Sequence, residues 1–237
     1  MSTKFKEYNS PEYQIIKDVF ESIPMMDVYI ANIVEEYIYS TVIEYYPSNK
    51  SIKCKYLTKY GEKDGEYKEW HHNSNRISDL HIQTTYVNGK KHGEHKVWYR
   101  DSRLALNETE GRTDNSVEDR GQLRIQTMYV DDKIHGEYRY WDEDGELLIQ
   151  TTCVNGKTHG EYKQFFTSGN LHIQTTYIDG KLHGEYKEWW ERNSNEDQGH
   201  LYIQTNYIDD KIHGEYKEWL ENGQLSQQTT YVDGVMI

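Results

Sequence analysis

The chain has 237 residues and a formal net charge of −13, from 27 basic and 40 acidic side chains. This balance argues against a nucleic-acid partner and against binding to anionic lipid, because nucleic acids and anionic lipids both attract Lys and Arg. No apolar run reaches 18 residues, so we expect no membrane insertion, and the first residues contain no signal-peptide pattern, so we expect a cytoplasmic protein.

The first 40 residues differ in pattern from the rest. Ser10-Pro11 is typical of a helix start, and Ile30, Ile33 and Val34 share one helical face. We therefore expect an N-terminal helical cap over residues 1–40, since repeat arrays need atypical end units. A recruitment module is the alternative interpretation of the same residues.

From residue 41 onward one motif returns. Gly-Glu-Tyr or a variant of it starts at Gly65, Gly93, Gly136, Gly160, Gly184 and Gly214, with a base period of 24 residues (136 to 160 and 160 to 184). A fixed period of this length indicates a stacked array of repeats. The longest interruption, about residues 101–122, is polar and lacks periodicity, which is typical of an inserted loop.

Each repeat contains two short runs with strand composition around a turn dipeptide such as Asp179-Gly180, which favours the type I′ turn of a two-residue hairpin. With that turn, Ile178 faces Lys181, Ile173 faces Tyr186 and Gln174 faces Glu185. The sequence therefore predicts a mainly β protein, in which residues 41–237 form an elongated single-layer antiparallel sheet of about 14 strands in tandem hairpins.

Alternation along these strands separates two faces. The expected packing face of one repeat carries Leu171, Ile173, Tyr177, Leu182, Gly184, Tyr186 and Trp190, and the more polar face carries His172, Gln174, Thr176, His183, Glu185, Lys187 and Trp189. Gly184 would leave room for a neighbouring aromatic ring.

A tyrosine, a turn with Gly, His-Gly-Glu-Tyr and an aromatic pair together resemble the MORN repeat. The 24-residue spacing and the Asn-Gly-Gln-Leu element are most similar to the variant in antitoxin-type MORN proteins of bacteria, and the resemblance covers about residues 41–237. Asp131-Asp132 and Asp209-Asp210 depart from it by lacking the turn glycine. The head from Ile23 to Ile38 resembles helical or F-box-like heads of repeat proteins in large DNA viruses, which implies a viral protein of the host cytoplasm or the virion.

The recurring histidines His92, His135, His159, His183 and His213 invite a metal interpretation. Equivalent residues of adjacent repeats lie two strands apart, roughly 9.6 Å, whereas zinc ligands lie about 2 Å from the ion. We therefore expect structural histidines, with no metal and no cofactor. Cys54 and Cys153 lie three repeats apart, too far for a disulfide, so we expect free thiols.

Two surfaces are candidates for partner binding. One is an aromatic column that the alternation places on the more polar face, made of Trp70, Trp98, Trp141, Phe165, Trp189 and Trp219. Its rings either pack against their neighbours or hold a protein partner, because Trp is common in binding hot spots. The other is the C-terminal edge strand with Gln227, Thr229 and Tyr231, which lacks Lys and Pro and could join two chains in an end-to-end homodimer.

The sequence contains no nucleophile–base pair, phosphate loop, dinucleotide fingerprint or metal-ligand spacing, so we expect no enzyme. The favoured function is a non-catalytic MORN-repeat protein that acts as a protein-interaction or scaffold module. The alternative is an antitoxin-like protein that neutralises one partner enzyme by binding it.

Overall fold

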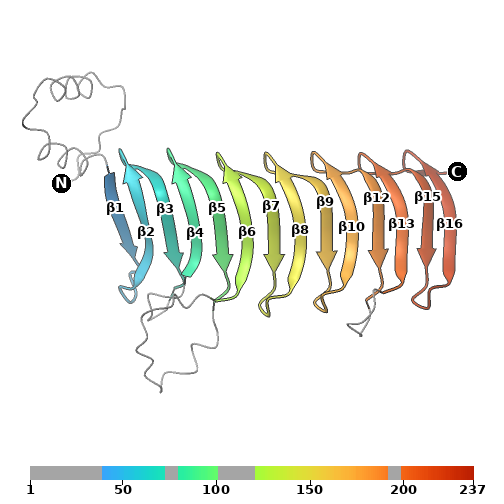
Figure 1. Cartoon of the computed structure of the whole chain (residues 1–237), viewed down its shortest axis with the longest axis horizontal. Helices are drawn as coiled ribbons and strands as arrows, with labels where there is room; N and C mark the ends of the chain where they lie inside the picture. Colours follow the sequence, from blue (N-terminus) through green and yellow to red (C-terminus); the bar gives the residue numbers. More distant parts are fainter. Residues whose placement is uncertain (1–38, 73–79, 101–120, 192–198) are drawn as a thin grey trace, which may run out of the picture.

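The computed structural model describes residues 39–72, 80–100, 121–191 and 199–237. These residues form one open antiparallel sheet of 17 strands in a single row, with β1 and β16 toward opposite ends (Figure 1). This confirms the prediction of a mainly β sheet of hairpin repeats. The expected helical cap falls on residues 1–38, and most of the polar insertion on residues 101–120, which lie outside the described residues; β1 begins at Tyr39.

The strands follow one another along the chain without a helix in the described ranges. They are β1 (Tyr39–Tyr45), β2 (Ile52–Lys59), β3 (Glu62–Trp70), β4 (Leu80–Val87), β5 (Lys90–Trp98), β6 (Leu123–Val130), β7 (Lys133–Trp141), β8 (Leu147–Val154), β9 (Lys157–Phe165), β10 (Leu171–Ile178), β11 (Lys181–Leu182), β12 (Gly184–Trp189), β13 (Leu201–Ile208), β14 (Lys211–Ile212), β15 (Gly214–Trp219), β16 (Leu225–Val232) and β17 (Val235–Met236). Accordingly, no helix of the described part is long and apolar enough to cross a membrane.

Each strand pairs with its neighbours in sequence, which makes the sheet a meander of hairpins. The first hairpin is β2–β3, the second β4–β5, the third β6–β7 and the fourth β8–β9. The fifth hairpin pairs β10 with β11 and β12, and the sixth pairs β13 with β14 and β15. The count exceeds the expected 14 because these two hairpins have an interrupted second strand and because β17 adds a short strand.

The hairpin turns have the backbone that their sequences predict. Asp179 has φ 52° and Gly180 has φ 86°, and the turns of the other five hairpins and of the β16–β17 pair likewise have two successive residues with positive φ. This is the requirement of a type I′ turn, which Asn, Asp and Gly meet most easily. Asp132 (φ 65°) and Asp210 (φ 70°) keep the same turn at positions where other hairpins have Gly, so the turn geometry survives the departure from the repeat pattern.

The predicted register is correct beside the turn and wrong farther from it. Ile178 pairs with Lys181 as expected, but Ile173 pairs with Glu188 instead of Tyr186, and Gln174 pairs with Lys187 instead of Glu185. Two extra residues in the second strand, around Gly184, cause the shift. Gly184 has φ 94° and lies opposite Tyr207 of the next hairpin. The shift is an even number of residues, so it leaves each side chain on the face that alternation assigns to it.

A second irregularity recurs where one hairpin passes to the next. Trp70 of β3 pairs with Leu80 of β4, while Glu69 pairs with Ile82, so β4 contains one extra residue, His81. The same bulge occurs at Tyr45, Trp98, Trp141, Phe165, Trp189 and Trp219. Bulges of this kind re-aim side chains, and here each residue of the aromatic column lies opposite a leucine.

The interior consists of rows that run across the strands. One row contains a buried threonine in five of the six hairpins: Thr84, Thr127, Thr151, Thr175 and Thr205. Thr127 and Thr151 donate hydrogen bonds to the backbone oxygens of Glu137 and Glu161, at 2.9 and 3.0 Å. Because each row joins only adjacent hairpins, the array is stabilised by contacts between nearest neighbours.

Candidate functional site

The aromatic column is packed most tightly near the N-terminal end of the sheet. Trp70 and Trp98 are 8% and 5% exposed and form a cluster with Leu80, against which Ile52 and Leu123 also pack. The other four members, Trp141, Phe165, Trp189 and Trp219, are half-buried. The bulge at each ring places its extra residue on the neighbouring strand, and the position of the column on the polar face stays a prediction. Packing is therefore one role of the column, and its role in partner binding stays a prediction.

A second row of side chains follows the aromatic column by one residue. Tyr46 and Tyr99 donate hydroxyl hydrogen bonds to the backbone oxygens of Trp70 and Trp141, at 2.8 and 3.0 Å. Trp190 donates its indole N–H to the oxygen of Trp219 at 3.0 Å. Each bond joins one repeat to the next at the same edge of the sheet, so this row ties successive hairpins together.

The bulge residues lie against this second row. The rings of His71 and His81 stack with centroids 4.2 Å apart, and Phe166 stacks on His172 at 4.1 Å. The guanidinium of Arg124 lies 5.2 Å from the centre of the Tyr99 ring. Sequence reasoning missed this row, although the aromatic residue that directly follows the column, as in Trp189-Trp190, was a visible signal.

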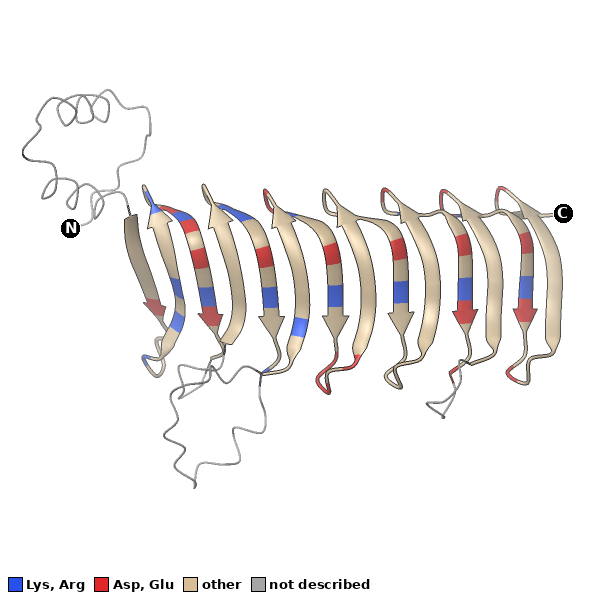
Figure 2. Cartoon of the chain, in the orientation of Figure 1, with Lys and Arg blue, Asp and Glu red and all other residues tan. Residues whose placement is uncertain are grey.

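The polar face carries a ladder of Glu, Lys and Gln side chains. Glu185 accepts hydrogen bonds from Lys187 of its own strand (2.8 Å) and from Gln204 of the next strand (2.9 Å). The same trio, with Arg139 in one copy, recurs from β3 to β16. Figure 2 shows it as acidic and basic bands on alternate strands.

The ladder favours the ionised form of several of its carboxylates. The Lys187 ammonium, and after it Gln204, lower the pKa of Glu185 below its ordinary value, and Lys163 and Gln174 do the same for Glu161. Because each negative charge has a positive partner 2.7–3.2 Å away in the ladder, this face is polar with locally balanced charge.

The opposite face carries pairs of tyrosine rings. Tyr186 of β12 meets Tyr207 of β13 edge to face, with centroids 5.6 Å apart. Equivalent pairs occur between several neighbouring hairpins, with His95 in place of Tyr in one of them. Burial raises the pKa of Tyr186, and a hydrogen bond to Glu188 raises it further. The Tyr186 hydroxyl group therefore stays protonated at neutral pH.

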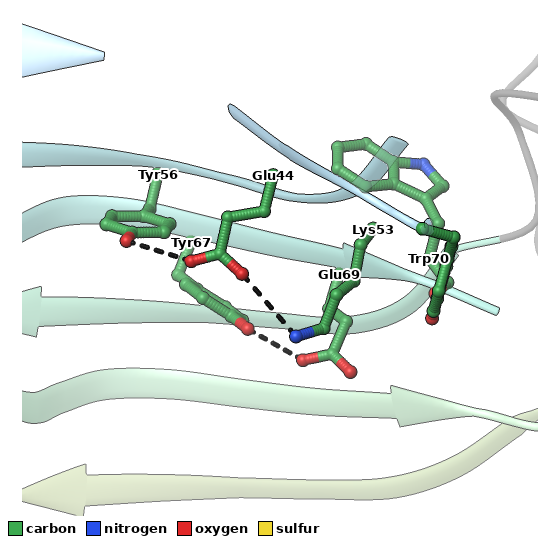
Figure 3. A network of polar contacts seen from close by, with 7 residues as sticks. Glu44, Lys53, Tyr56, Tyr67, Glu69 and Trp70 are labelled. Atoms are coloured by element: carbon green, nitrogen blue, oxygen red, sulfur yellow. Dashed lines mark hydrogen bonds and ion pairs between the residues drawn. The ribbon is translucent and has the colours of Figure 1, made fainter. Parts of the chain in front are cut away.

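The N-terminal end of this face holds a network of polar contacts (Figure 3). Glu44 of β1 accepts hydrogen bonds from Tyr56 at 3.3 Å and from Lys53 at 3.4 Å. Tyr67 donates to Glu69 at 2.6 Å beside this pair. Cys54 is 2% exposed, and burial raises its pKa. The thiol is thus held as the unreactive protonated form, and the surrounding groups fasten β1 to β2.

The recurring histidines contact the turn of the following hairpin. The Nδ1 atoms of His159 and His213 lie 3.3 and 3.5 Å from the Oδ1 atoms of Asp179 and Asp233. His92 and His183 make longer contacts of the same kind, at 3.7 Å. Among the described residues no group of His, Cys, Asp and Glu has the arrangement of a metal site. These contacts give the histidines a structural place between repeats.

The remaining predicted residues lie as follows. Cys54 and Cys153 are buried free thiols, as expected. Gln227, Thr229 and Tyr231 lie in β16, which pairs with β15 on one side and with β17 through Tyr231 and Val232. Whether two chains join at this edge stays a prediction.

Three segments of the chain, residues 134–155, 158–179 and 212–233, match the family model of the MORN repeat variant. Each segment runs from the second strand of one hairpin into the turn of the next. The match supports a MORN repeat protein, and the same pairing continues in the hairpins between and before the matched segments. No curated protein matches the chain.

Proposed function

We propose that this MORN repeat protein is a non-catalytic interaction module that holds protein partners along its sheet. The observation that carries the proposal is the repetition of the same surface groups in consecutive hairpins. The Glu–Lys–Gln ladder on one face recurs in consecutive hairpins, and the tyrosine pairs on the other face recur between most of them. A catalytic site needs different groups that converge on one point, whereas repeated equivalent groups along a line suit an extended contact with another protein.

The test compares partner capture by the full chain with capture by a variant of its half-buried rings. Trp141→Ala combined with Trp189→Ala removes two rings of the aromatic column that are less buried than Trp98. We expect weaker partner binding with an unchanged β-type circular dichroism spectrum. Loss of the β signal would show that these rings serve the fold, and full retention of binding would remove the column from the interface.

The stoichiometry of the captured complex separates the scaffold from the enzyme-neutralising alternative. A scaffold should hold several structural partners, whereas an antitoxin-like protein should hold one enzyme and inhibit its turnover in proportion to the amount added. Purified partners should be titrated against the chain and followed by mass and by partner activity. The genomic neighbourhood tests both this alternative and the predicted viral origin.

A further inference from the structure

In each hairpin, the second residue after the turn lies next to the tyrosine pairs. In the first, second and fourth hairpins this residue is Lys63, Lys91 and Thr158. The backbone oxygen of each accepts a hydrogen bond from the turn of the next hairpin, at 2.8, 3.0 and 2.8 Å. The three residues are therefore equivalent in the backbone, and they differ only in their side chains.

In the first two hairpins the lysine at this position already binds aromatic rings. The ammonium of Lys63 lies 4.2 Å from the centre of the Tyr67 ring, 4.8 Å from Tyr56 and 5.0 Å from Tyr86. The ammonium of Lys91 lies 5.1 Å from the centre of the ring of Tyr129. Both are within the roughly 6 Å over which a cation is attracted to an aromatic face. The protein itself thus shows which chemistry the tyrosine pairs accept.

The fourth hairpin presents the same ring pair without a lysine. Tyr162 and Tyr177 have centroids 5.5 Å apart and an interplanar angle of 67°. For Tyr67 and Tyr86, beside Lys63, the corresponding values are 5.7 Å and 64°. Two of the three rings that receive an internal ammonium in the first hairpin, Tyr67 and Tyr86, are therefore reproduced in the fourth in nearly the same arrangement, while Thr151 stands in place of Tyr56.

Thr158 is also the shortest side chain at its position. The third, fifth and sixth hairpins place Ile134, Leu182 and Ile212 there, which are long enough to cover the neighbouring rings. Directly opposite Thr158 in the register is Cys153, at a position where most hairpins have tyrosine. Two small residues thus meet beside the Tyr162–Tyr177 pair.

The charge around this pair favours a cation. The whole chain carries a formal net charge of −13, which attracts basic partners. Burial raises the pKa of Tyr177, and the nearby Asp210 carboxylate adds to the rise. The negative charge of Asp210 is therefore felt at the ring that a cation would face.

We propose that Tyr162 and Tyr177 form a recognition site for the lysine or arginine side chain of a protein partner, at the place that Lys63 occupies in the first hairpin. This site deepens the proposed interaction function and rests on it for the nature of the partner. The internal lysines at the equivalent positions of the first two hairpins exclude an external cation there, so the fourth hairpin would fix where along the array the partner is anchored.

The site can be tested with tetramethylammonium chloride as the probe, on the full chain labelled with 3-fluorotyrosine. Fluorine resonances of the two rings are assigned with Tyr162→Phe and Tyr177→Phe. We expect saturable shifts of both resonances, beyond those from equal sodium chloride, and an affinity roughly three-fold or more above that of the neutral isostere tert-butanol. Equal affinities for the cation and the isostere would overturn the proposal.

Two exchanges between hairpins supply matched controls. Thr158→Leu installs the residue of the fifth hairpin and should abolish the shifts, while Leu182→Thr should create them at Tyr186 and Tyr207. Each exchange places a residue that a neighbouring hairpin already carries, and unchanged fluorine signal dispersion checks the fold. Shifts that persist in Thr158→Leu would overturn the proposal. The titration needs no partner, so its failure would leave the interaction function standing, whereas failed partner capture would leave the cation site standing.

Discussion

The Oδ1 atom of Asp210 accepts a hydrogen bond from the backbone nitrogen of Leu182, 2.8 Å away and one hairpin earlier. Asp132 makes the same contact with the backbone nitrogen of Lys91, also at 2.8 Å. Both aspartates stand where other turns have glycine and keep a positive φ. The carboxylate thus adds a hydrogen bond between hairpins at a position where a positive φ is less favourable for aspartate than for glycine.

The first prediction separates these two effects in Asp210. Asp210→Gly relaxes the backbone but removes the hydrogen bond, while Asp210→Ala removes the bond and keeps an unfavourable positive φ. The alanine variant should therefore be less stable than the glycine variant by roughly 1–2 kcal/mol. Urea unfolding of both variants measures the difference, and an alanine variant as stable as the glycine variant would contradict the account of the turn.

The second prediction concerns the aromatic column. Trp98 is 5% exposed, so Trp98→Ala should leave a cavity and lower the free energy of unfolding by roughly 3–5 kcal/mol. Trp219→Ala should cost clearly less, because that ring is only half-buried. Hydrogen exchange resolved by strand would locate each loss. Equal losses for the two variants would show that burial does not set the contribution of the column.

The third prediction is a pH dependence caused by His95. Burial, and after it the nearby Lys91, lower the pKa of His95 from 6.5 to about 4. Folding favours the neutral form of the ring. Its contribution to the free energy of unfolding is therefore present above pH 6.5 and is lost as the pH falls toward about 4. A shift of this size corresponds to an upper limit of ~3 kcal/mol.

The variant His95→Tyr, which restores the residue of the other hairpins, should remove this part of the pH dependence. Unfolding free energies measured from pH 7 to pH 4 test the expectation. A variant whose stability falls as steeply as that of the unmodified chain would assign the loss to other groups.

The fourth prediction concerns the charge ladder. Lys96, Lys163 and Lys187 lower the pKa values of their glutamate partners, so those carboxylates stabilise the fold above about pH 4.5 and lose this effect as the pH falls through the lowered values. Each pair is half-exposed, and its contribution is roughly 0.2–1 kcal/mol. Glu185→Gln should therefore reduce stability slightly at pH 7 and not at pH 3. An effect unchanged at 1 M salt would contradict this electrostatic origin.

The hairpins were predictable because their turns are local. Asp179-Gly180 and its equivalents determine a type I′ turn, and alternation from that turn correctly places Glu185 with Lys187 on one face and Tyr186 on the other. The bulge residue His172, which lies 3.4 Å from Glu188, departs from its predicted polar face. The two bulges were not predicted, because each depends on the pairing with a neighbouring strand. Gly184 was a visible signal, but it was interpreted as room for a ring, whereas its φ of 94° shows that the backbone itself requires glycine.

Less of the candidate site could be predicted, because its contacts also depend on the pairing with neighbouring strands. Trp70 and Trp98 could be identified as one column, but their burial depends on the bulge that places Leu80 between them. The lysine–tyrosine contacts could be predicted only from the pairing of two adjacent hairpins, since Lys63 lies in β3 of the first hairpin and Tyr86 in β4 of the second. Interactions within one repeat follow from the sequence pattern, and interactions between repeats require the register.

The pairing of every strand with its neighbours in sequence has a consequence for cutting and rejoining the chain. A break in one hairpin turn, such as Asp179-Gly180, divides the sheet into two blocks, and every strand keeps its partners except those that flank the cut, β10 on one side and β11 and β12 on the other. Separately produced halves should each retain most of their ladder, and their cut edges should pair again when mixed, because the exposed backbone groups of one half complement those of the other. We therefore expect that a protein with this architecture can be reassembled from two fragments that are cut at a chosen hairpin turn.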